Sequence, residues 1–269
     1  MDFSKVIIMT DLDGTLLTDD KQILPQDMEA IRRFRAGGGL FSVATGRGYS
    51  MARPVVEKLE LDIPAVVFNG AAVFDFKEDR FVWRCEIGGH ALKYIKRLVD
   101  EFPHIGIEVL HEHSIYVPYM NKTEREHLAL ENVTPVECLL WELPRDGWLK
   151  VLLADTPENI DRIEKYVSES DMRDAQWVRS APMYYECLPK GVDKSTGFRE
   201  LIKYLGCGDR FSVAAGDFMN DEAMIRFADL GVAVDSAQTE VKTAADLIVC
   251  DNNSGAMAEI IGYIERLNK

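Results

Sequence analysis

Short apolar runs alternate with segments of helical spacing at the start of the chain. Residues 6–10, 40–44 and 65–68 are apolar runs typical of buried strands. Residues 25–35 and 50–59 lie between these runs and place apolar side chains on one helical face. This order predicts parallel strands joined by crossover helices. The alternation returns after residue 190, with helices expected at 196–205, 221–228, 241–245 and 254–267 and strands at 211–215, 231–234 and 247–249.

The middle of the chain has a different pattern. Residues 74–85 predict a hairpin, and two apolar runs, 105–109 and one beginning at residue 115, predict a second one. Thr156-Pro157-Glu158 combines a capping residue, a proline and an acid, which is typical of a helix start. Further helices are expected at 90–101 and 123–131, and further strands at 149–154, 176–178 and 184–188.

The two patterns together predict the fold class. We expect an α/β protein with a doubly wound, parallel-sheet, Rossmann-like core and an inserted α+β domain. Residues 1–82 and 189–269 would form the core domain, and residues 83–188 would form the inserted domain.

Composition narrows the classes of partner. The net charge is -14, which argues against nucleic acid and against an anionic membrane surface. The five cysteines are scattered without a CxxC pair, which favours a reducing compartment, and no apolar run has the length of a membrane span. We therefore expect a cytoplasmic protein, either a monomer or a homodimer.

Two carboxylates follow the first apolar run. Asp11 and Asp13 stand one residue apart and precede a Gly-Thr turn. The carboxyl ends of parallel strands are where open α/β sheets bind ligands, so these acids are candidates for nucleophilic, metal-binding or proton-transfer roles. Taken alone, the same residues also fit a strand followed by an ordinary Asp-Gly turn.

Further acids are expected at the same edge of the sheet. Asp217 follows another apolar run, and Asp221 comes four residues later at a helix start. Four carboxylates in one crevice repel one another unless a cation neutralises them. A hard divalent cation with oxygen ligands answers this need, and Mg²⁺ is the usual ion beside phosphate. We therefore name Asp11, Asp13, Asp217 and Asp221 as candidate magnesium ligands.

Other residues at these strand ends suit a phosphate group. Thr45 offers a hydroxyl, and Gly46 leaves its backbone N–H accessible to an anion. Asn220 lies at an expected helix start, where N–H groups favour negative charge. Lys194 precedes another helix and supplies a point charge. Metal, hydroxyl, amide and lysine together predict a site for a phosphoryl group on a small phosphorylated metabolite.

The chain resembles the haloacid dehalogenase-like (HAD) phosphohydrolases, and more narrowly their Cof-type sugar-phosphatase branch. The match spans nearly the whole sequence and includes a Phe-Asn-Gly-Ala segment at 68–71. Four motifs of that family occur in order, namely DLDGTLL at 11–17, ATGR at 44–47, GVDK at 191–194 and GDFMND at 216–221.

The resemblance implies a role for each matching residue. Asp11 would be the nucleophile that forms an aspartyl-phosphate, and Asp13 would protonate the leaving oxygen and then activate water. Thr45 and Lys194 would bind the transferring group, assisted by Asn220. Mg²⁺ would be held by the Asp11 carboxylate, the Asp13 carbonyl and Asp217, with Asp221 close by. The inserted domain would be a mobile cap over the site.

Some positions stay open. Arg47 either contacts substrate or forms a structural ion pair, and Asn69 is a further candidate for substrate contact. Ser195 replaces the glycine usual after the third-motif lysine, and Asp235 adds an acid where the family pattern has none.

The leading hypothesis is a Mg²⁺-dependent phosphatase that hydrolyses small phosphomonoesters, with sugar phosphates favoured. A phosphorylated cofactor such as pyridoxal phosphate or a flavin mononucleotide is another possible substrate. A phosphosugar mutase fits the same residues, and so does a non-catalytic phospho-acceptor or sensing module. A dinucleotide-binding oxidoreductase is disfavoured, because the first strand–helix turn lacks GxGxxG and its acids would repel a pyrophosphate.

Overall fold

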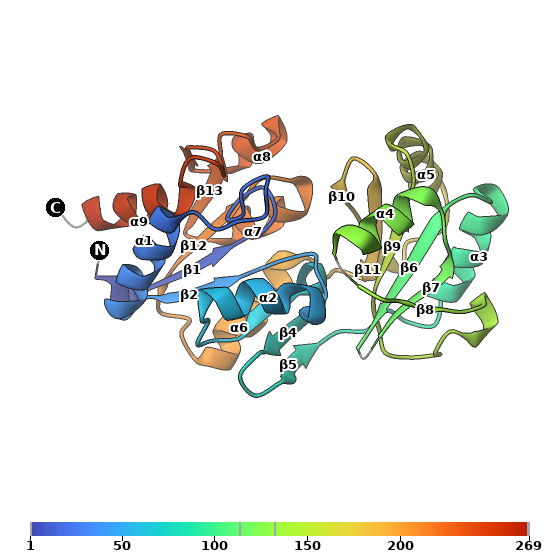
Figure 1. Ribbon diagram of the computed structural model, residues 1–269, viewed down its shortest axis with the longest axis horizontal. Coiled ribbons are helices and arrows are strands. Elements are labelled where there is room, and N and C mark those ends of the chain that lie inside the picture. The colour runs from blue at the N-terminus through green and yellow to red at the C-terminus, as the bar shows by residue number, and fades with distance from the viewer. Residues whose placement is uncertain (1, 113, 132, 268–269) are drawn as a thin grey trace. The chain divides into compact units, whose positions relative to one another are not determined.

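The computed structural model describes residues 2–112, 114–131 and 133–267, and the chain divides into two compact units. The core unit comprises Met1–Trp83 and Asp193–Lys269, and the insert unit comprises Arg84–Val192. Figure 1 shows the core unit in blue and orange, because both ends of the chain build it, and the insert unit in green to yellow.

The core unit contains a five-stranded parallel sheet in the order β14-β13-β12-β1-β2. Every residue of its central strand is buried, as the apolar run at the start of the chain predicted. The last residue of that strand, Thr10, pairs with Ala215 on one side and Val43 on the other, so the carboxyl ends of three strands meet. The strands are β1 (Val6–Thr10), β2 (Leu40–Val43), β12 (Phe211–Gly216), β13 (Leu230–Val234) and β14 (Leu247–Val249).

Helices cover this sheet in packed groups. α1 (Pro25–Ala36) packs against α9 (Ala256–Arg266), and α6 (Lys194–Leu205) packs against α7 (Glu222–Phe227). Phe34 and Phe198 are fully buried beneath these helices and anchor them to the sheet. The remaining helices of the described core are α2 (Tyr49–Leu59), α8 (Thr239–Ala244) and the short 3-10 turns Phe3–Lys5, Phe68–Gly70 and Met219–Asp221.

The third predicted strand meets the edge of the parallel sheet but belongs to a second sheet. β3 (Ala65–Val67) meets the core sheet through a bridge between Ala44 and Val66. It otherwise pairs in antiparallel fashion with β4 (Ala72–Asp75), which continues to β5 (Arg80–Arg84) in a separate three-stranded sheet. The bridge to the core sheet is parallel, as the alternation of strands and helices predicted, and the antiparallel pairing with β4 arises because the chain reverses after Val67.

The insert unit is an α+β unit around a six-stranded sheet in the order β10-β11-β9-β6-β7-β8. Its pairings are antiparallel except between β7 and β8. The strands are β6 (Gly106–His111), β7 (Ile115–Tyr119), β8 (Val136–Glu137), β9 (Trp148–Ala154), β10 (Ala175–Ala181) and β11 (Tyr184–Pro189). The helices are α3 (Ala91–Glu101), α4 (Lys122–Leu130) and α5 (Pro157–Glu169), and a 3-10 turn spans Leu140–Glu142.

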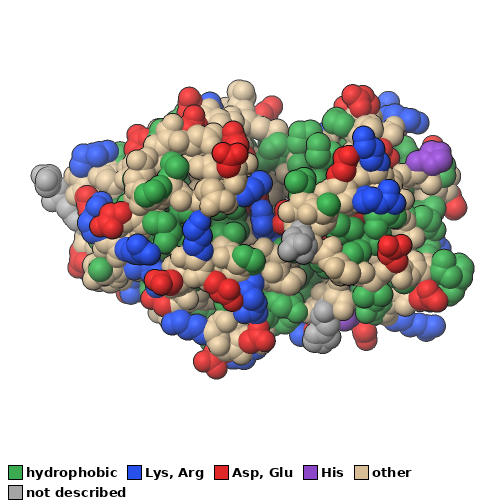
Figure 2. Space-filling view, viewed as in Figure 1, with side chains coloured by type: hydrophobic (Ala, Val, Ile, Leu, Met, Phe, Trp, Pro, Cys, Tyr) green, Lys and Arg blue, Asp and Glu red, His purple; other side chains and the backbone are tan. Residues whose placement is uncertain are grey.

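The predicted fold class is confirmed, since a parallel-sheet α/β core accompanies a separate, mostly antiparallel sheet. The helix start predicted at Thr156 is also confirmed, because its side chain accepts a hydrogen bond from the Asn159 backbone N–H. No helix among the described residues is long and apolar enough to span a membrane. On the face shown in Figure 2, acidic and basic side chains are interspersed over the surface.

Gly70 lets two distant segments of the core unit approach closely. Its φ is +95°, and a Cβ at this position would lie 1.8 Å from the carbonyl oxygen of Asp193. Asp193 is the N-cap of α6, where its side chain accepts a hydrogen bond from the Thr196 backbone N–H. The glycine therefore allows the start of α6 to lie against the turn that follows β3.

We predict that Gly70→Ala lowers the free energy of unfolding of the core unit by at least about 2 kcal/mol, because it adds a backbone clash to an unfavourable φ. Urea denaturation followed by circular dichroism measures the change. Gly208→Ala is the matched control, since a Cβ there would meet its nearest atom at 3.9 Å. Equal stability of the two variants would contradict this account of Gly70.

A pair of acids is buried within the insert unit. Glu108 on β6 and Glu124 on α4 are fully buried, and the oxygens of both carboxyl groups lack a donor partner among the described residues. Burial, and then the charge of Glu108, raise the pKa of Glu124 to about 9. Burial also raises the pKa of Glu108 to about 7, although Lys150 partly offsets it. A proton shared between the two carboxyl groups explains how both are accommodated.

We predict that the insert unit loses stability as the pH rises from about 5 to about 9. The folded pKa values lie above the unfolded value of 4.5, so the folded state holds more protons over this range. Each unit by which a folded pKa exceeds the unfolded value contributes about 1.4 kcal/mol to the free energy of unfolding, and this contribution is lost as the pH rises. Fluorescence of Trp148 and Trp177 reports the unfolding. Glu124→Gln should flatten the pH dependence, whereas Glu126→Gln, at an exposed position of the same helix, should retain it.

Candidate active site

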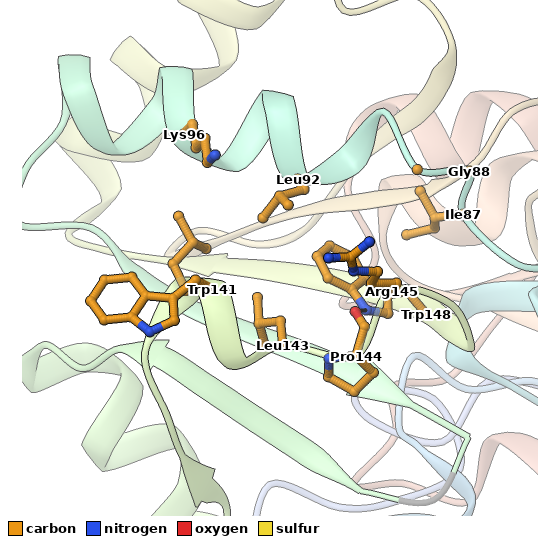
Figure 3. A pocket seen from close by; sticks show the side chains of 11 residues that line it. Ile87, Gly88, Leu92, Lys96, Trp141, Leu143, Pro144, Arg145 and Trp148 are labelled. Atoms are coloured by element: carbon orange, nitrogen blue, oxygen red, sulfur yellow. Dashed lines mark hydrogen bonds between the residues drawn. The ribbon is translucent and has the colours of Figure 1, made fainter.

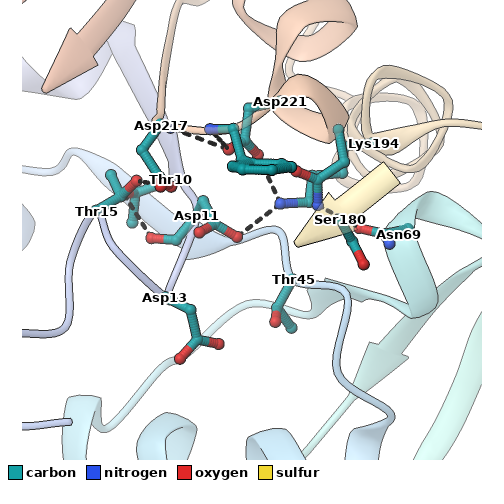
Figure 4. A network of polar contacts seen from close by, with 12 residues as sticks. Thr10, Asp11, Asp13, Thr15, Thr45, Asn69, Ser180, Lys194, Asp217 and Asp221 are labelled. Atoms are coloured by element: carbon teal, nitrogen blue, oxygen red, sulfur yellow. Dashed lines mark hydrogen bonds and ion pairs between the residues drawn. The ribbon is translucent and has the colours of Figure 1, made fainter. Parts of the chain in front are cut away.

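Three acids meet at the carboxyl ends of β1 and β12. Carboxylate oxygens of Asp11, Asp217 and Asp221 all lie within 4.8 Å of one another. Asp11 follows β1 directly, and Asp217 follows β12. Figure 4 shows these side chains pointing toward one another, together with Lys194. The structure thus brings together three of the four acids that the sequence placed in one crevice.

Lys194 lies between two of these acids. Its Nζ is 2.6 Å from Asp11 Oδ1 and 2.6 Å from Asp221 Oδ1, and the side chain is 1% exposed. Burial alone would lower the pKa of Lys194, but the charges of Asp11 and Asp221 outweigh burial and raise it. Lys194 is therefore a fixed cation beneath the acids rather than a solvated side chain.

Asp221 holds the turn that carries Asp217. Its Oδ2 accepts hydrogen bonds from the backbone N–H groups of Asp217 and Phe218, at 3.0 and 3.2 Å. Because Oδ1 accepts from Lys194, both oxygens of Asp221 already have donors. Asp217 in turn accepts a hydrogen bond from the hydroxyl of Thr15 at 3.0 Å. Asp11 and Asp217 are consequently better placed than Asp221 to offer oxygens to a cation.

The acids carry more negative charge than Lys194 compensates. Burial raises the pKa of Asp11 well above its usual range, and the nearby Asp221 and Asp217 add to this effect although Lys194 opposes it. Burial and the charge of Asp221 likewise raise the pKa of Asp217 to about 7. A divalent cation would remove this excess, and oxygen donors are the ligands that Mg²⁺ takes. The residues present therefore fit the predicted magnesium ion.

Asp13 is held apart from this cluster. Two nitrogens of Arg47 donate to its carboxylate, Nε to Oδ2 at 2.8 Å and a terminal nitrogen to Oδ1 at 2.9 Å. The Nζ of Lys21 donates to Oδ1 at 2.7 Å. Burial would raise the pKa of Asp13, but the bonds and charges of Arg47 and Lys21 together lower it to about 2. The sequence had placed all four acids in one mutually repelling group, whereas Asp13 has cations of its own.

The predicted phosphate-binding residues surround the turn after β2. Thr45 is 1% exposed, and its hydroxyl accepts a hydrogen bond from the Arg47 backbone N–H at 3.1 Å. Asn220 donates to the side-chain oxygen of Asn69 at 3.0 Å. A Cβ on Gly46 would meet that same Asn69 amide at 3.1 Å, so the glycine lets the amide approach the turn.

Two contributors to the site were missed by the sequence reasoning. Thr15 binds Asp217, and Lys21 binds Asp13. Thr15 stands in the Gly-Thr turn after Asp13, where its hydroxyl could have been suspected. The two departures from the family pattern have local partners, since Ser195 Oγ donates to Asp193 at 2.6 Å and Asp235 accepts from Lys242 at 3.1 Å.

A cavity in the insert unit offers different chemistry. It has a volume of about 530 Å³, and Leu92, Leu143 and Trp148 give it an apolar lining. Lys96 and Arg145 also line it, and Figure 3 shows both side chains at the hollow. Its lining contains no carboxylate, so this cavity does not supply the acids that a hydrolytic site of the kind described above requires.

Comparison with known proteins places the chain in a family. A family model described as haloacid dehalogenase-like hydrolase matches residues 8–261. The chain belongs to this family. The resemblance inferred from the four motifs is therefore confirmed.

Two curated relatives of this haloacid dehalogenase-like hydrolase are phosphatases. One is the 5-amino-6-(5-phospho-D-ribitylamino)uracil phosphatase of Bacillus subtilis, 26% identical over 266 residues and covering 97% of this chain and 98% of the relative. The other is the pyridoxal phosphate phosphatase of Escherichia coli, which is 27% identical over 278 residues. That match covers 95% of this chain and 97% of the relative. A crystal structure from Thermotoga maritima is 26% identical, has a TM-score of 0.80 and covers 96% of each chain.

We predict that Lys194→Met lowers the free energy of unfolding of this hydrolase by about 3–5 kcal/mol at pH 7. The substitution removes one partner of a buried ion pair and leaves Asp11 and Asp221 without a compensating charge. Urea denaturation measures the change. Lys203→Met lies on the same helix at a side chain that is 78% exposed, and it should leave stability nearly unaltered. Similar curves for both variants would refute a structural role for the buried pair.

Proposed function

We propose that this hydrolase is a Mg²⁺-dependent phosphatase that cleaves small phosphomonoesters through an aspartyl-phosphate intermediate. The observation that carries the proposal is the buried Asp11 carboxylate, which lies 2.6 Å from Lys194 and within 4.8 Å of Asp217 and Asp221. Phosphoryl transfer depends mainly on positioning and on neutralising charge, and this arrangement provides a fixed nucleophile beside a fixed cation.

The metal-binding residues follow from the same cluster. Asp11 and Asp217 would hold Mg²⁺ through their carboxylates and Asp13 through its backbone carbonyl, with Asp221 close by. The ion would neutralise charge on the phosphoryl oxygens and on the acids themselves. Both oxygens of Asp221 have protein donors, which supports a role in fixing the position of Asp217 and Lys194.

In the first step an oxygen of Asp11 attacks phosphorus, and the bond from phosphorus to the ester oxygen breaks. The leaving oxygen takes the proton of the protonated Asp13 carboxyl, which releases the alcohol and leaves Asp13 as a carboxylate. In the second step a water oxygen attacks the phosphorus of the aspartyl-phosphate while Asp13 accepts a proton from that water. The bond from phosphorus to Asp11 then breaks and inorganic phosphate leaves.

The remaining residues bind the phosphoryl oxygens. Lys194 supplies positive charge, Thr45 supplies a hydroxyl, and Gly46 supplies a backbone N–H. Asn220 is oriented by Asn69, to which it donates a hydrogen bond at 3.0 Å. These donors are neutral or positive, so they stabilise the charge that spreads over the transferring group.

The substrate class rests on the relatives and on the chemistry of the site. Both phosphatases described above act, by name, on a phosphate ester of a small metabolite. We propose a substrate of the same general class, with sugar phosphates and phosphorylated cofactors as its members to be tested. A cytoplasmic location and a monomeric or homodimeric state remain predictions from composition.

The test is phosphate release from a panel of sugar, nucleotide and cofactor phosphates, with and without Mg²⁺. We expect Mg²⁺-dependent turnover of at least one sugar or cofactor phosphate. Asp11→Asn should lower kcat by at least about 1,000-fold, because an amide is a poor nucleophile. Asp209→Asn, at an exposed position after α6, is the matched control and should keep wild-type activity.

The outcomes separate the alternative functions. Isomerisation of a phosphosugar with little phosphate release would indicate a mutase. A stable aspartyl-phosphate that accumulates without turnover would indicate a phospho-acceptor module. Turnover that persists in Asp11→Asn, or that is insensitive to chelation of Mg²⁺, would refute the proposed mechanism.

A further inference from the structure

Asp13 is clamped by two cations from different parts of the core unit. Arg47 makes a two-point contact with both oxygens of the carboxylate, at 2.8 and 2.9 Å. Lys21 adds a third contact at 2.7 Å. A planar guanidinium that meets a carboxylate through two nitrogens fixes its plane as well as its distance. The orientation of Asp13 is therefore set by these partners.

The Arg47 side of the clamp is anchored in the turn that carries Thr45. The Arg47 backbone N–H donates to the Thr45 hydroxyl at 3.1 Å, and its carbonyl accepts from the Phe68 backbone N–H at 2.9 Å. The Arg47 side chain is 13% exposed, against 37% for Asp13. Arg47 is fixed by hydrogen bonds of its backbone, and its guanidinium group can therefore hold the neighbouring carboxylate in place.

The Lys21 side of the clamp comes from the turn after Thr18. The Lys21 backbone N–H donates to the Thr18 carbonyl at 2.8 Å, and the Lys21 φ is +58°. Its side chain is 58% exposed, so solvent screens its charge more than that of Arg47. Lys21 therefore contributes less to the orientation of Asp13 than Arg47 does.

We propose that Arg47, assisted by Lys21, is a positioning residue that acts on the reaction through Asp13 and does not bind the substrate's leaving group. The proposal rests on the proposed phosphatase function. Both steps of that reaction pass a proton at the Asp13 carboxylate, to the ester oxygen in the first and from water in the second. A carboxylate free to rotate would spend less time aimed at either oxygen, so loss of the clamp slows both steps.

The sequence left two roles open for Arg47, a substrate contact or a structural ion pair. The proposal assigns it the ion pair. Two of the three guanidinium nitrogens, Nε and one terminal nitrogen, are directed to Asp13, and this two-point contact favours the ion pair over a substrate contact. Arg47→Lys keeps the charge but loses the two-point geometry, so it separates orientation from charge.

The central experiment is a double-mutant cycle between Arg47→Met and Asp13→Asn. We expect Arg47→Met to lower kcat by at least about 10-fold with little change in KM, because proton transfer is impaired and binding is not. Arg47→Lys should fall between wild type and Arg47→Met. In the Asp13→Asn background Arg47→Met should have no further effect, since Arg47 acts only through that carboxylate.

Trapping the phosphoenzyme provides a second readout. Acid quenching during turnover should show a larger fraction of aspartyl-phosphate in Arg47→Met than in wild type if water activation becomes the slower step. Arg53→Met is the matched control, because Arg53 lies on α2 and pairs with Glu57 and Asp79. That variant should match wild type in kcat, KM and trapped phosphoenzyme.

Two results would overturn the proposal. One is a rise in KM at unchanged kcat in Arg47→Met that persists in the Asp13→Asn background, which would assign Arg47 to substrate binding. The other is a crystal structure of Arg47→Met in which Asp13 keeps its orientation. The crystal structure needs no turnover, so it tests the orientation of Asp13 even if the protein hydrolyses no phosphate ester. Failure of this proposal can therefore be told apart from failure of the proposed function.

Discussion

The candidate site depends on one buried interaction, the contact of Lys194 with Asp11 and Asp221. A lysine that is 1% exposed can stay charged only because two carboxylates accept its hydrogen bonds at 2.6 Å. Asp11 follows β1 and Asp221 lies in the turn after β12, so the contact joins these two segments to the start of α6. Loss of any partner would leave an uncompensated charge inside the core unit.

Charge is divided within the site in a way that serves two purposes. Lys194 lies under the acids that face a cation, whereas Arg47 and Lys21 take Asp13 out of that group. The first arrangement leaves an excess of negative charge, which favours a divalent ion. The second fixes the orientation of Asp13. One acidic sequence motif thus supplies two carboxylates with opposite electrostatic surroundings.

Much of the candidate site could be predicted from the sequence because its polar side chains come directly after apolar runs. Asp11, Thr45 and Asp217 follow strands whose burial is evident from composition, and parallel strands bring their ends together. The contacts of Lys21 and Arg47 with Asp13 could not be predicted, since no periodicity tells which cation folds back on which acid. The reversal after Val67 was missed for a similar reason, because the left-handed backbone at Asn69 gives no hydrophobic signal.

The split construction of the core unit also bears on how the chain folds. β1 pairs with β12, so Val6 must find Phe211 across a loop that contains the whole insert unit. Closing a long loop costs conformational entropy, but a loop whose middle has already folded behaves as a much shorter one. During synthesis from the N-terminus, β2 can pair with one edge of β1 early, but the other edge stays unpaired until residues 211–216 emerge. Early folding of the insert unit would therefore shorten the search and protect the nascent core from aggregation.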